Sequence, residues 1–440
     1  MRGVAAILAQ RGARVIGSDL SEFAGLGELV ARGVVVHIGH AAAHLPEDTE
    51  LVVASAAIPA SNPELTRARA LGIPVVSYAE LIGRLMSAGD GVSVAGTHGK
   101  STTTALTAYI FRHAGLDPSF VVGAESRQLG GGSGVGCGRH FIVESCEFAR
   151  SFLHQRPLLA AILNIEQDHL DCYSDLPEIV SAFRSFAGNV SAGGVIVANG
   201  ADPRVAAAVE NAAARVETFG FGHGVTWGAT EARSKRGRYT FQVCREDTPL
   251  FETSLRLAGR HNVLNALAAT ALACHGGAAV EAIDDALRSF EGIERRMSLR
   301  GTTRGATVVD DYAHHPTEIA ATLRAVRSQY QPRRTLVVFQ PHQHSRTRVL
   351  MEEFARCFEG ADVVLVPDIY SARDSEEERR LTGSSDLVER ISAAGGLARY
   401  VPALEDVTAE LLAELTEGDL VVTMGAGDVW KVADGLVGRG

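Results

Sequence analysis

Short apolar runs alternate with amphipathic stretches along the chain, and this alternation predicts an α/β fold. Near the N-terminus, helical periodicity covers residues 4–11, and apolar runs typical of strands lie at residues 14–19, 34–38, 51–55 and 74–77. Strands separated by helices are typical of a doubly wound domain with a parallel sheet. Ligands bind such a sheet where its strands end, so Asp19 and Ser55 are candidate substrate-binding residues.

Two interpretations of Asp19 stay open. Dinucleotide-binding domains place an acid at the end of such a strand, where it bonds a ribose. Asp19 could instead cap the following helix together with Ser18. Helical periodicity also begins almost at Met1, without the strand and Gly-rich turn that normally open a Rossmann-type domain. We therefore expect the true gene product to begin a strand and a loop before Met1.

The most informative stretch is residues 92–104, where an apolar strand, a loop with two glycines and a helix over 101–114 follow one another. This arrangement directs backbone N–H groups and the positive helix end at a phosphate. In the loop sequence GTHGKS, Lys100 can reach outer phosphates and Ser101 can ligate Mg²⁺. Val94 occupies the first glycine position of the strict pattern G-x-x-x-x-G-K-[ST], so a plain strand–helix turn with an exposed lysine stays the alternative. The candidate nucleotide-binding residues are Gly96, Thr97, His98, Gly99, Lys100, Ser101 and Thr102.

Lysine usage supports a special role for Lys100. Only three of the 42 basic residues are lysines, at positions 100, 235 and 431. Arginine's rigid, planar fork is a poor substitute for a compact ammonium among phosphate oxygens. The chain otherwise uses arginine, so a lysine in this loop indicates that the loop requires an ammonium group there.

Two further strands lead into residues that can ligate a metal. The apolar run at residues 140–143 is followed by Glu144, and the run at 158–163 by NIEQDH, which ends at His169. Because the carboxyl ends of parallel strands meet at one sheet edge, both residues are expected near the phosphate loop, as Mg²⁺ ligands with Ser101. Taken alone, His169 would be a loop histidine with a structural hydrogen bond. The nearby Lys100 and Glu144 favour the ligand interpretation.

The next segments predict antiparallel strands over residues 226–257 and a helix from residue 259 to about residue 274. Asn262 and Asn265 lie one turn apart on that helix and could contact a purine edge. The alternative is that Asn262 caps the helix, which leaves Asn265 unexplained.

The C-terminal pattern predicts a third domain. Four apolar strands, each followed by a polar cluster, lie at residues 307–310, 335–339, 363–366 and 420–423. They indicate a second doubly wound sheet that presents its polar edge to a cleft. The predicted architecture is a Rossmann-like domain at 1–88, a central P-loop-type ATPase domain at 89–297 and a Rossmann-like C-terminal domain at 298–440.

Composition and charge narrow the function classes. A net charge of −10 argues against a nucleic-acid-binding surface as the main function. No apolar run approaches the ~20 residues that span a bilayer, and no signal peptide is apparent. The six cysteines lack C-x-x-C spacing, which favours reduced thiols in a cytoplasmic enzyme. We expect no membrane insertion, and a monomer or a weak homodimer.

Taken together, these motifs resemble the Mur ligases, the ATP-dependent amide-forming enzymes of peptidoglycan synthesis, and within them the alanine-adding type. The resemblance spans all three predicted domains in order. Its segments are GTHGKS at 96–101, NIEQDHLD at 164–171, GRHNVLNA at 259–266, Arg295 with Arg296, DDYAHHPTE at 310–318, QPHQHSRTR at 340–348 and GAGD at 425–428.

The resemblance implies ATP and Mg²⁺ as cofactors, UDP-N-acetylmuramate and L-alanine as substrates, and an acyl-phosphate intermediate. It implies that Lys100 binds phosphates, that Ser101 and Glu144 hold one Mg²⁺, and that His169 serves a second. Nucleotide contacts are implied for His261, Asn262, Asn265, Arg296 and Asp311. Tyr312, His314 and Arg346 would line the alanine side, so the catalytic set is Lys100, Glu144, His169, His314 and Arg346.

The chain departs from the family pattern at two places. Three alternative functions also stay open. Gln343 occupies a position that is usually arginine, and Cys146 lies in a segment that is usually more acidic. One alternative function is a recycling ligase that attaches a ready-made peptide to the same sugar nucleotide. Another is a truncated, non-catalytic nucleotide-binding paralogue. A plain P-loop kinase would leave the two other α/β domains unexplained.

Overall fold

The computed structural model describes residues 1–23, 25–169, 172–372 and 374–438. The last two residues of the NIEQDHLD segment and Arg373 therefore lie outside the described residues. Contacts divide the chain into two compact units. The first comprises Met1–Ile165, Val180–Phe219 and Ala268–Ala286, and the second Glu166–Ile179, Gly220–Leu267 and Leu287–Gly440.

The N-terminal part of the first unit contains two small parallel sheets. Its elements are α1 (Arg2–Gln10), β1 (Ile16–Asp19), α2 (Leu26–Ala31), β2 (Val35–Ile38), β3 (Val52–Ala54), α3 (Pro63–Ala70), β4 (Val75–Ser77) and α4 (Tyr78–Met86). Among the described residues, β1 pairs only with β2, and β3 only with β4. Val4 and Ile7 of α1 pack with Phe141 and Val143, because the apolar face of this helix meets a strand of the larger sheet.

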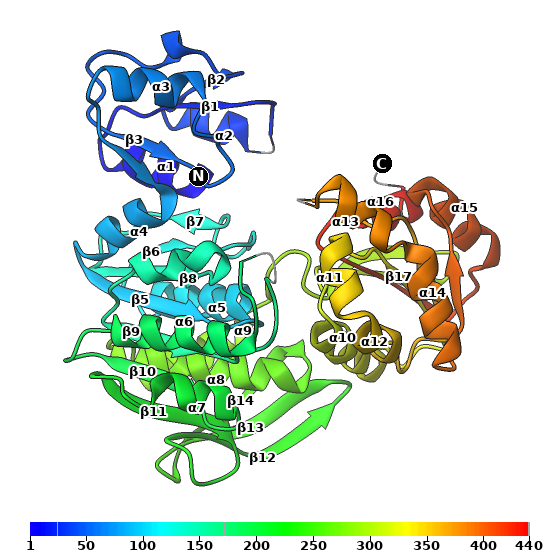
Figure 1. The fold of residues 1–440 in the computed structure, drawn as a ribbon. Helices are drawn as coiled ribbons and strands as arrows, with labels where there is room; N and C mark the ends of the chain where they lie inside the picture. The colour runs from blue at the N-terminus through cyan, green and yellow to red at the C-terminus, as the bar shows by residue number, and fades with distance from the viewer. Residues whose placement is uncertain (24, 170–171, 373, 439–440) are drawn as a thin grey trace. The chain divides into compact units, whose positions relative to one another are not determined.

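In that larger sheet, strands follow one another in the order β11–β10–β9–β5–β8–β6–β7 (Figure 1). They are β5 (Asp90–Ala95), β6 (Ser119–Val121), β7 (Ser133–Gly134), β8 (His140–Ser145), β9 (Leu159–Ile162), β10 (Val195–Asn199) and β11 (Arg215–Phe221). The central strand β5 runs parallel to β8 and β9, with Val94 opposite Glu144 and Ala95 opposite Ile162. This register brings the start of the phosphate loop, Glu144 and the segment after β9 to one edge of the sheet.

The helices of this region are α5 (Lys100–His113) and α7 (Pro203–Val209), and three more run from one unit into the other: α6 (Leu176–Gly188), α8 (Arg260–His275) and α9 (Val280–Ser289). The glycine-rich segment at residues 130–138 contains β7, which pairs antiparallel with β6. None of the described helices is long and apolar enough to cross a membrane.

Along the chain, the second unit first forms an antiparallel meander of three strands, as predicted for residues 226–257. It consists of β12 (Trp227–Lys235), β13 (Arg238–Arg245) and β14 (Thr248–Ala258). A six-stranded sheet follows in the order β15–β16–β20–β17–β18–β19. Its strands are β15 (Ser298–Thr303), β16 (Ala306–Asp311), β17 (Arg334–Phe339), β18 (Val363–Val366), β19 (Ala398–Tyr400) and β20 (Asp419–Met424), all parallel to their neighbours except β15.

Both faces of this six-stranded sheet are buried, and helices cover each face (Figure 1). The helices are α10 (Pro316–Tyr330), α11 (His344–Val349), α12 (Met351–Arg356), α13 (Glu376–Leu381), α14 (Ser384–Ala393), α15 (Leu404–Glu414) and α16 (Trp430–Leu436). Along β17, Val337 and Phe339 pack in the cluster with α10, α12 and α14, whereas Leu336 and Val338 pack with α15 and α16. A strand buried on both faces reads as a continuous apolar run, which explains why the sequence pattern located it.

Candidate functional site

The phosphate loop of the first unit is shaped by two glycines. Gly96 follows β5 with φ of 144°, and a Cβ there would lie 2.9 Å from the Cβ of Leu163. Gly99 adopts φ of 82° at the position that caps α5. Both positions favour glycine, since other residues rarely adopt such backbone angles. The loop therefore turns sharply enough to direct the first N–H groups of α5 outward, as anion binding requires.

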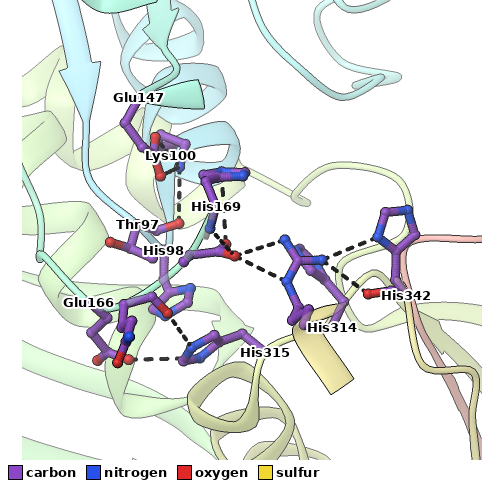
Figure 2. A network of polar contacts seen from close by, with 12 residues as sticks. Thr97, His98, Lys100, Glu147, Glu166, His169, His314, His315 and His342 are labelled. Carbon is purple, nitrogen blue, oxygen red and sulfur yellow. Dashed lines mark hydrogen bonds and ion pairs between the residues drawn. The ribbon is translucent and has the colours of Figure 1, made fainter. Parts of the chain in front are cut away.

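Lys100 lies at the first residue of α5 and is held inside the loop (Figure 2). Its Nζ donates to the carbonyl oxygens of Gly96 at 2.5 Å and Thr97 at 3.0 Å, and to Glu147 Oε1 at 3.1 Å. The Lys100 side chain is only 12% exposed. The alternative interpretation, a plain strand–helix turn with an exposed lysine, is therefore wrong. Burial alone would lower the Lys100 pKa, but the carboxylate of Glu147 raises it above its ordinary value. Lys100 is therefore a fixed cation.

Ser101 and Glu144 form the oxygen-rich part of this site. The Ser101 hydroxyl donates to Glu144 Oε1 at 2.9 Å, and the backbone N–H of Gly123 donates to Glu144 Oε2 at 2.6 Å. A Cβ at Gly123 would lie 2.7 Å from the carboxylate, so only glycine leaves room for it. Glu144 lies inside β8 rather than just after it, a small correction to the predicted strand end.

Asn164 is a contributor to this loop that the sequence analysis did not single out. Its side-chain Oδ1 accepts the backbone N–H of His98 at 2.7 Å, and its Nδ2 donates to the carbonyl oxygen of His98 at 3.1 Å. The backbone N–H of Thr97 donates to the Asn164 carbonyl oxygen at 3.0 Å. An asparagine that bonds both sides of one peptide fixes the loop conformation. The sequence held one signal for this role, because Asn164 is the first residue of the NIEQDH segment that follows a strand.

In the second unit, the segment that carries His169 is joined to α11 by an ion pair. Arg346 donates from Nε and Nη2 to Asp168 Oδ1 at 3.1 and 2.8 Å, and both side chains are 7% exposed. Burial alone would raise the pKa of the Asp168 carboxyl, but Arg346 lowers it far below its usual range. The same oxygen accepts the backbone N–H of His169 at 2.7 Å. Asp168 was not predicted as a site residue.

The residues implied for the alanine side do come together in this unit. The rings of Tyr312 and His314 meet edge to face at 5.4 Å, and His314 lies 6.2 Å from the ring of His342. Arg346 Nη1 lies 3.2 Å from Nδ1 of His342. Glu318, missed by the sequence analysis, accepts the backbone N–H of His314 at 3.1 Å. Burial, reinforced by the Arg346 cation, lowers the pKa of His314 to about 3.

This pKa predicts an acid-sensitive fold. His314 is neutral in the folded state down to about pH 3, whereas in the unfolded chain it binds a proton below about pH 6.5. Stability is therefore lost as the pH falls through this window, by about 2 kcal/mol at pH 5. We expect His314→Gln to lose less stability than the unsubstituted chain between pH 7 and pH 5 in urea unfolding. The exposed His223→Gln is the control, and equal pH dependence in all three proteins would contradict the assignment.

The residues implied for the nucleotide also gather in the second unit. Asp311 accepts the backbone N–H groups of Met297 at 2.7 Å and Ala313 at 2.8 Å, and burial raises its pKa to about 6. Burial, reinforced by Arg296, lowers the pKa of His261 to about 4. At pH 7 His261 is therefore neutral, whereas Asp311 stays largely ionised beside the Arg296 cation.

The two asparagines of α8 are bonded to each other. Asn265 Nδ2 donates to Asn262 Oδ1 at 3.1 Å, and Asn262 Nδ2 donates to the carbonyl oxygen of Ala258 at 2.7 Å. Asn262 lies inside α8, which begins at Arg260, and its side chain bonds the Ala258 carbonyl oxygen and the Asn265 side chain rather than a backbone N–H of the first helical turn. The capping alternative is therefore wrong.

The N-terminal candidates lie at strand ends, as predicted. Asp19 is exposed at the end of β1, and Ser55 follows β3. The next helix, α2, has Gly25 at its N-cap, so Asp19 and Ser18 do not cap it and that alternative is wrong. Ser18 instead donates to Glu64 Oε2 at 2.7 Å.

Three parts of the chain match domains of one enzyme family. Residues 1–89 match the domain described as Mur ligase family, catalytic domain, residues 94–273 the Mur ligase middle domain, and residues 295–427 the Mur ligase, glutamate ligase domain. The UDP-N-acetylmuramate--L-alanine ligase of Clostridium novyi is 40% identical over 440 residues, which is 99% of this chain and 94% of the relative.

Solved structures agree in fold. The UDP-N-acetylmuramate-alanine ligase from Thermotoga maritima is 26% identical with a TM-score of 0.81, over 99% of this chain and 95% of that chain. The UDP-N-acetylmuramate:L-alanyl-gamma-D-glutamyl-meso-diaminopimelate ligase from Neisseria meningitides is 29% identical with a TM-score of 0.61, over 67% of this chain and 96% of that chain. The predicted α/β class, with Rossmann-like outer domains and a central P-loop-type domain, is confirmed. The chain belongs to the Mur ligase family.

Proposed function

We propose that this chain is an ATP-dependent ligase that joins L-alanine to UDP-N-acetylmuramate in peptidoglycan synthesis. The observation that carries this proposal is the 40% identity, along 99% of the chain, to a relative with that printed activity. The geometry supports it independently, because a buried lysine at a Gly-bearing loop and a Ser–Glu oxygen pair lie at the same strand ends. These are the parts that phosphoryl transfer requires.

We assign one role to each predicted domain. Residues 1–88 would bind the UDP moiety, with Asp19 and Ser55 at their strand ends. Residues 89–297 would bind ATP through the phosphate loop. Residues 298–440 would bind L-alanine. The assigned alanine-side residues are Tyr312, His314 and Arg346, and the assigned nucleoside contacts are His261, Asn262, Asn265, Arg296 and Asp311.

The donor set at Ser101 and Glu144 fits Mg²⁺. A hydroxyl and a carboxylate are hard oxygen ligands, and their oxygens lie 2.9 Å apart with the second carboxylate oxygen fixed by Gly123. A bound Mg²⁺ would supply charge neutralisation for the phosphate oxygens. His169 is the assigned ligand for a second ion on the substrate side.

The proposed reaction has two steps. A carboxylate oxygen of the muramate attacks the γ-phosphorus of ATP and ADP leaves, which gives an acyl phosphate. The alanine amine then attacks the acyl carbon, phosphate leaves, and the nitrogen loses a proton to form the amide. Lys100 is suited to both steps as a permanent cation near the phosphates, since its raised pKa prevents it from acting as a base. The assigned residues otherwise position the reactants, which such a path chiefly requires.

The test is phosphate release with ATP, Mg²⁺ and UDP-N-acetylmuramate, with each L-amino acid supplied separately. We expect release that depends on L-alanine, with a product whose mass equals the sugar nucleotide plus one alanyl residue. Serine and glycine are the informative near neighbours, because each changes the side chain by a single small group. Absence of release with every amino acid would contradict the proposal.

A second candidate is the recycling ligase, which the 29% identity to the Neisseria enzyme favours. The same assay with the tripeptide L-alanyl-γ-D-glutamyl-meso-diaminopimelate as acceptor separates the two. Turnover with the tripeptide but not with alanine would select the recycling reaction. Tight ATP binding without turnover on either acceptor would select a non-catalytic paralogue.

A further inference from the structure

The turn before β15, within the second unit, holds an arginine in a strained backbone conformation. Arg295 and Met297 adopt φ of 58° and 50°, left-handed angles that cost a non-glycine residue free energy unless its surroundings hold it. The Tyr312 backbone N–H donates to the Arg295 carbonyl oxygen at 2.7 Å, and the Met297 N–H donates to Asp311 Oδ2 at 2.7 Å. These two bonds fix the turn against the carboxyl end of β16.

The Arg295 side chain joins two strand ends of the six-stranded sheet. Its Nε donates to Asp310 Oδ2 at 3.0 Å, at the end of β16. Its Nη1 and Nη2 donate to the carbonyl oxygens of Gly427 at 3.3 Å and Gly425 at 2.8 Å, in the GAGD loop (residues 425–428) that follows β20. Asp310 is fully buried, and its other carboxylate oxygen accepts the Thr423 hydroxyl at 2.7 Å. The guanidinium is therefore held in one position by three acceptors.

The GAGD loop is held from its other side by Gln340. The Oε1 of Gln340 accepts the backbone N–H groups of Asp428 and Val429, each at 3.1 Å. A Cβ at Gly427 would lie 2.6 Å from that oxygen, so only glycine leaves room for this close approach. Gln340 thus bonds the N–H groups of the loop, whereas Arg295 bonds its carbonyl oxygens. The position of the loop depends on both side chains.

Arg295 also lies against a residue assigned to the alanine side. Its guanidinium carbon is 5.1 Å from the centroid of the Tyr312 ring, and that of Arg296 is 5.4 Å away. The face of an aromatic ring attracts a cation at such distances. The Tyr312 ring in turn meets the His314 ring edge to face at 5.4 Å. Because three bonds fix the Arg295 guanidinium, it gives the Tyr312 ring a fixed surface to pack on.

We propose that Arg295 is a positioning residue for L-alanine binding, because it holds the Tyr312 ring in place on the alanine side of the site. This proposal rests on the proposed function, in which Tyr312 lines that side. The role requires a guanidinium, whose planar fork bonds three acceptors and still presents a flat face to the ring. Since Arg295 acts through the ring, its effect on alanine binding should disappear in a variant that lacks the ring.

The experiment compares Arg295→Lys, Tyr312→Ala and the double variant. Lysine keeps a positive charge beside the buried Asp310, so the fold should survive this substitution. Arg334→Lys is the matched control, because Arg334 bonds the buried Asp419 at 2.8 Å and a backbone carbonyl oxygen at 3.2 Å. This control pair lies at the opposite, amino ends of β17 and β20. Each protein is assayed for kcat, for the KM of each substrate and for its unfolding midpoint in urea.

Acrylamide quenching of Trp430 fluorescence adds a readout that needs no turnover. Trp430 begins α16, two residues after the GAGD loop, and is 36% exposed. The other tryptophan of the chain, Trp227, is fully buried. Quenching therefore reports mainly on the region that follows the loop.

We expect Arg295→Lys to raise the KM of L-alanine about 10-fold or more, because a small misplacement of a positioning group is enough for such a loss. The KM values of ATP and UDP-N-acetylmuramate should stay within about threefold, and acrylamide should quench Trp430 more strongly. Tyr312→Ala should raise the KM of L-alanine at least as far, and the double variant no further. Arg334→Lys should lower the unfolding midpoint without changing any KM.

Three results would overturn the proposal. A KM of L-alanine that stays within about threefold in Arg295→Lys would show that the guanidinium does not position the ring. If the losses from Arg295→Lys and Tyr312→Ala multiply in the double variant, Arg295 acts on the amino acid without the ring. If only kcat falls, in step with the unfolding midpoint as in Arg334→Lys, the contact is structural only.

Failure of the proposed function is distinguishable from failure of this inference. The unsubstituted chain would then show no alanine-dependent phosphate release. The difference in Trp430 quenching between this chain and Arg295→Lys would remain measurable, and it would still show whether Arg295 holds the GAGD loop.

Discussion

Lys100→Ala is expected to lower the rate of alanine-dependent phosphate release at least about 100-fold, because it removes the fixed cation that stabilises the phosphoryl group in transfer. The Lys100 ammonium lies beside Glu147, and their side chains are 12% and 3% exposed. Lys100→Arg should also be poor, since the planar guanidinium cannot occupy the space among the Gly96 and Thr97 carbonyl oxygens in the same way.

The same substitution is expected to cost stability, by about 3 kcal/mol, because removing one partner leaves the buried Glu147 carboxylate without its neutralising ammonium. This effect must be separated from the catalytic one. The double variant Lys100→Ala with Glu147→Gln removes the buried charge, so it should recover much of the stability. It should not recover activity. Recovery of stability alone would identify the rate loss as catalytic.

The measurements are urea unfolding and phosphate release, both well below the unfolding midpoint of each variant. Lys235→Ala is the control, because Lys235 is an exposed lysine at the end of β12 and plays no part in the proposed site. It should be active and stable. Near-normal turnover by Lys100→Ala would reject the phosphate-loop assignment.

Local chemistry explains why so much of the site could be predicted. The phosphate loop is a contiguous stretch, so its strand, glycines and lysine are visible in thirteen consecutive residues. The C-terminal strands were visible because Leu336 to Phe339 are buried on both faces and form one apolar run. Glu144 was expected near Ser101 because parallel strands align their carboxyl ends.

Long-range pairing explains what could not be predicted. Asp168 and Arg346 are 178 positions apart, and no local pattern connects them. Short strands such as β19 are missed because three residues are too few to show a period. The burial of Lys100 was also invisible, since a lysine in a Gly-bearing loop is ordinarily solvated. The ammonium is buried because Glu147, from the segment after β8, comes back to meet it.

Glu144→Gln is expected to raise the Mg²⁺ concentration at half-maximal rate by about tenfold or more, because a neutral amide is a weaker ligand than a carboxylate for a hard cation. The fold should tolerate the change. The amide oxygen can accept the Gly123 N–H, and the amide nitrogen can donate to the Ser101 hydroxyl, so both present contacts have a replacement. A loss of metal affinity without a loss of stability is therefore the expected signature.

A Mg²⁺ titration of phosphate release at saturating ATP measures the effect, with urea unfolding as the check on stability. Glu246→Gln, at an exposed turn between β13 and β14, is the control for loss of one negative charge. Gly123→Ala provides an independent test, because its Cβ would displace the Glu144 carboxylate without changing any charge. If Glu144 holds the ion, both Glu144→Gln and Gly123→Ala shift the titration in the same direction. An unshifted titration in both variants would refute its role as a ligand, since neither the charge nor the position of the carboxylate would then matter to the metal.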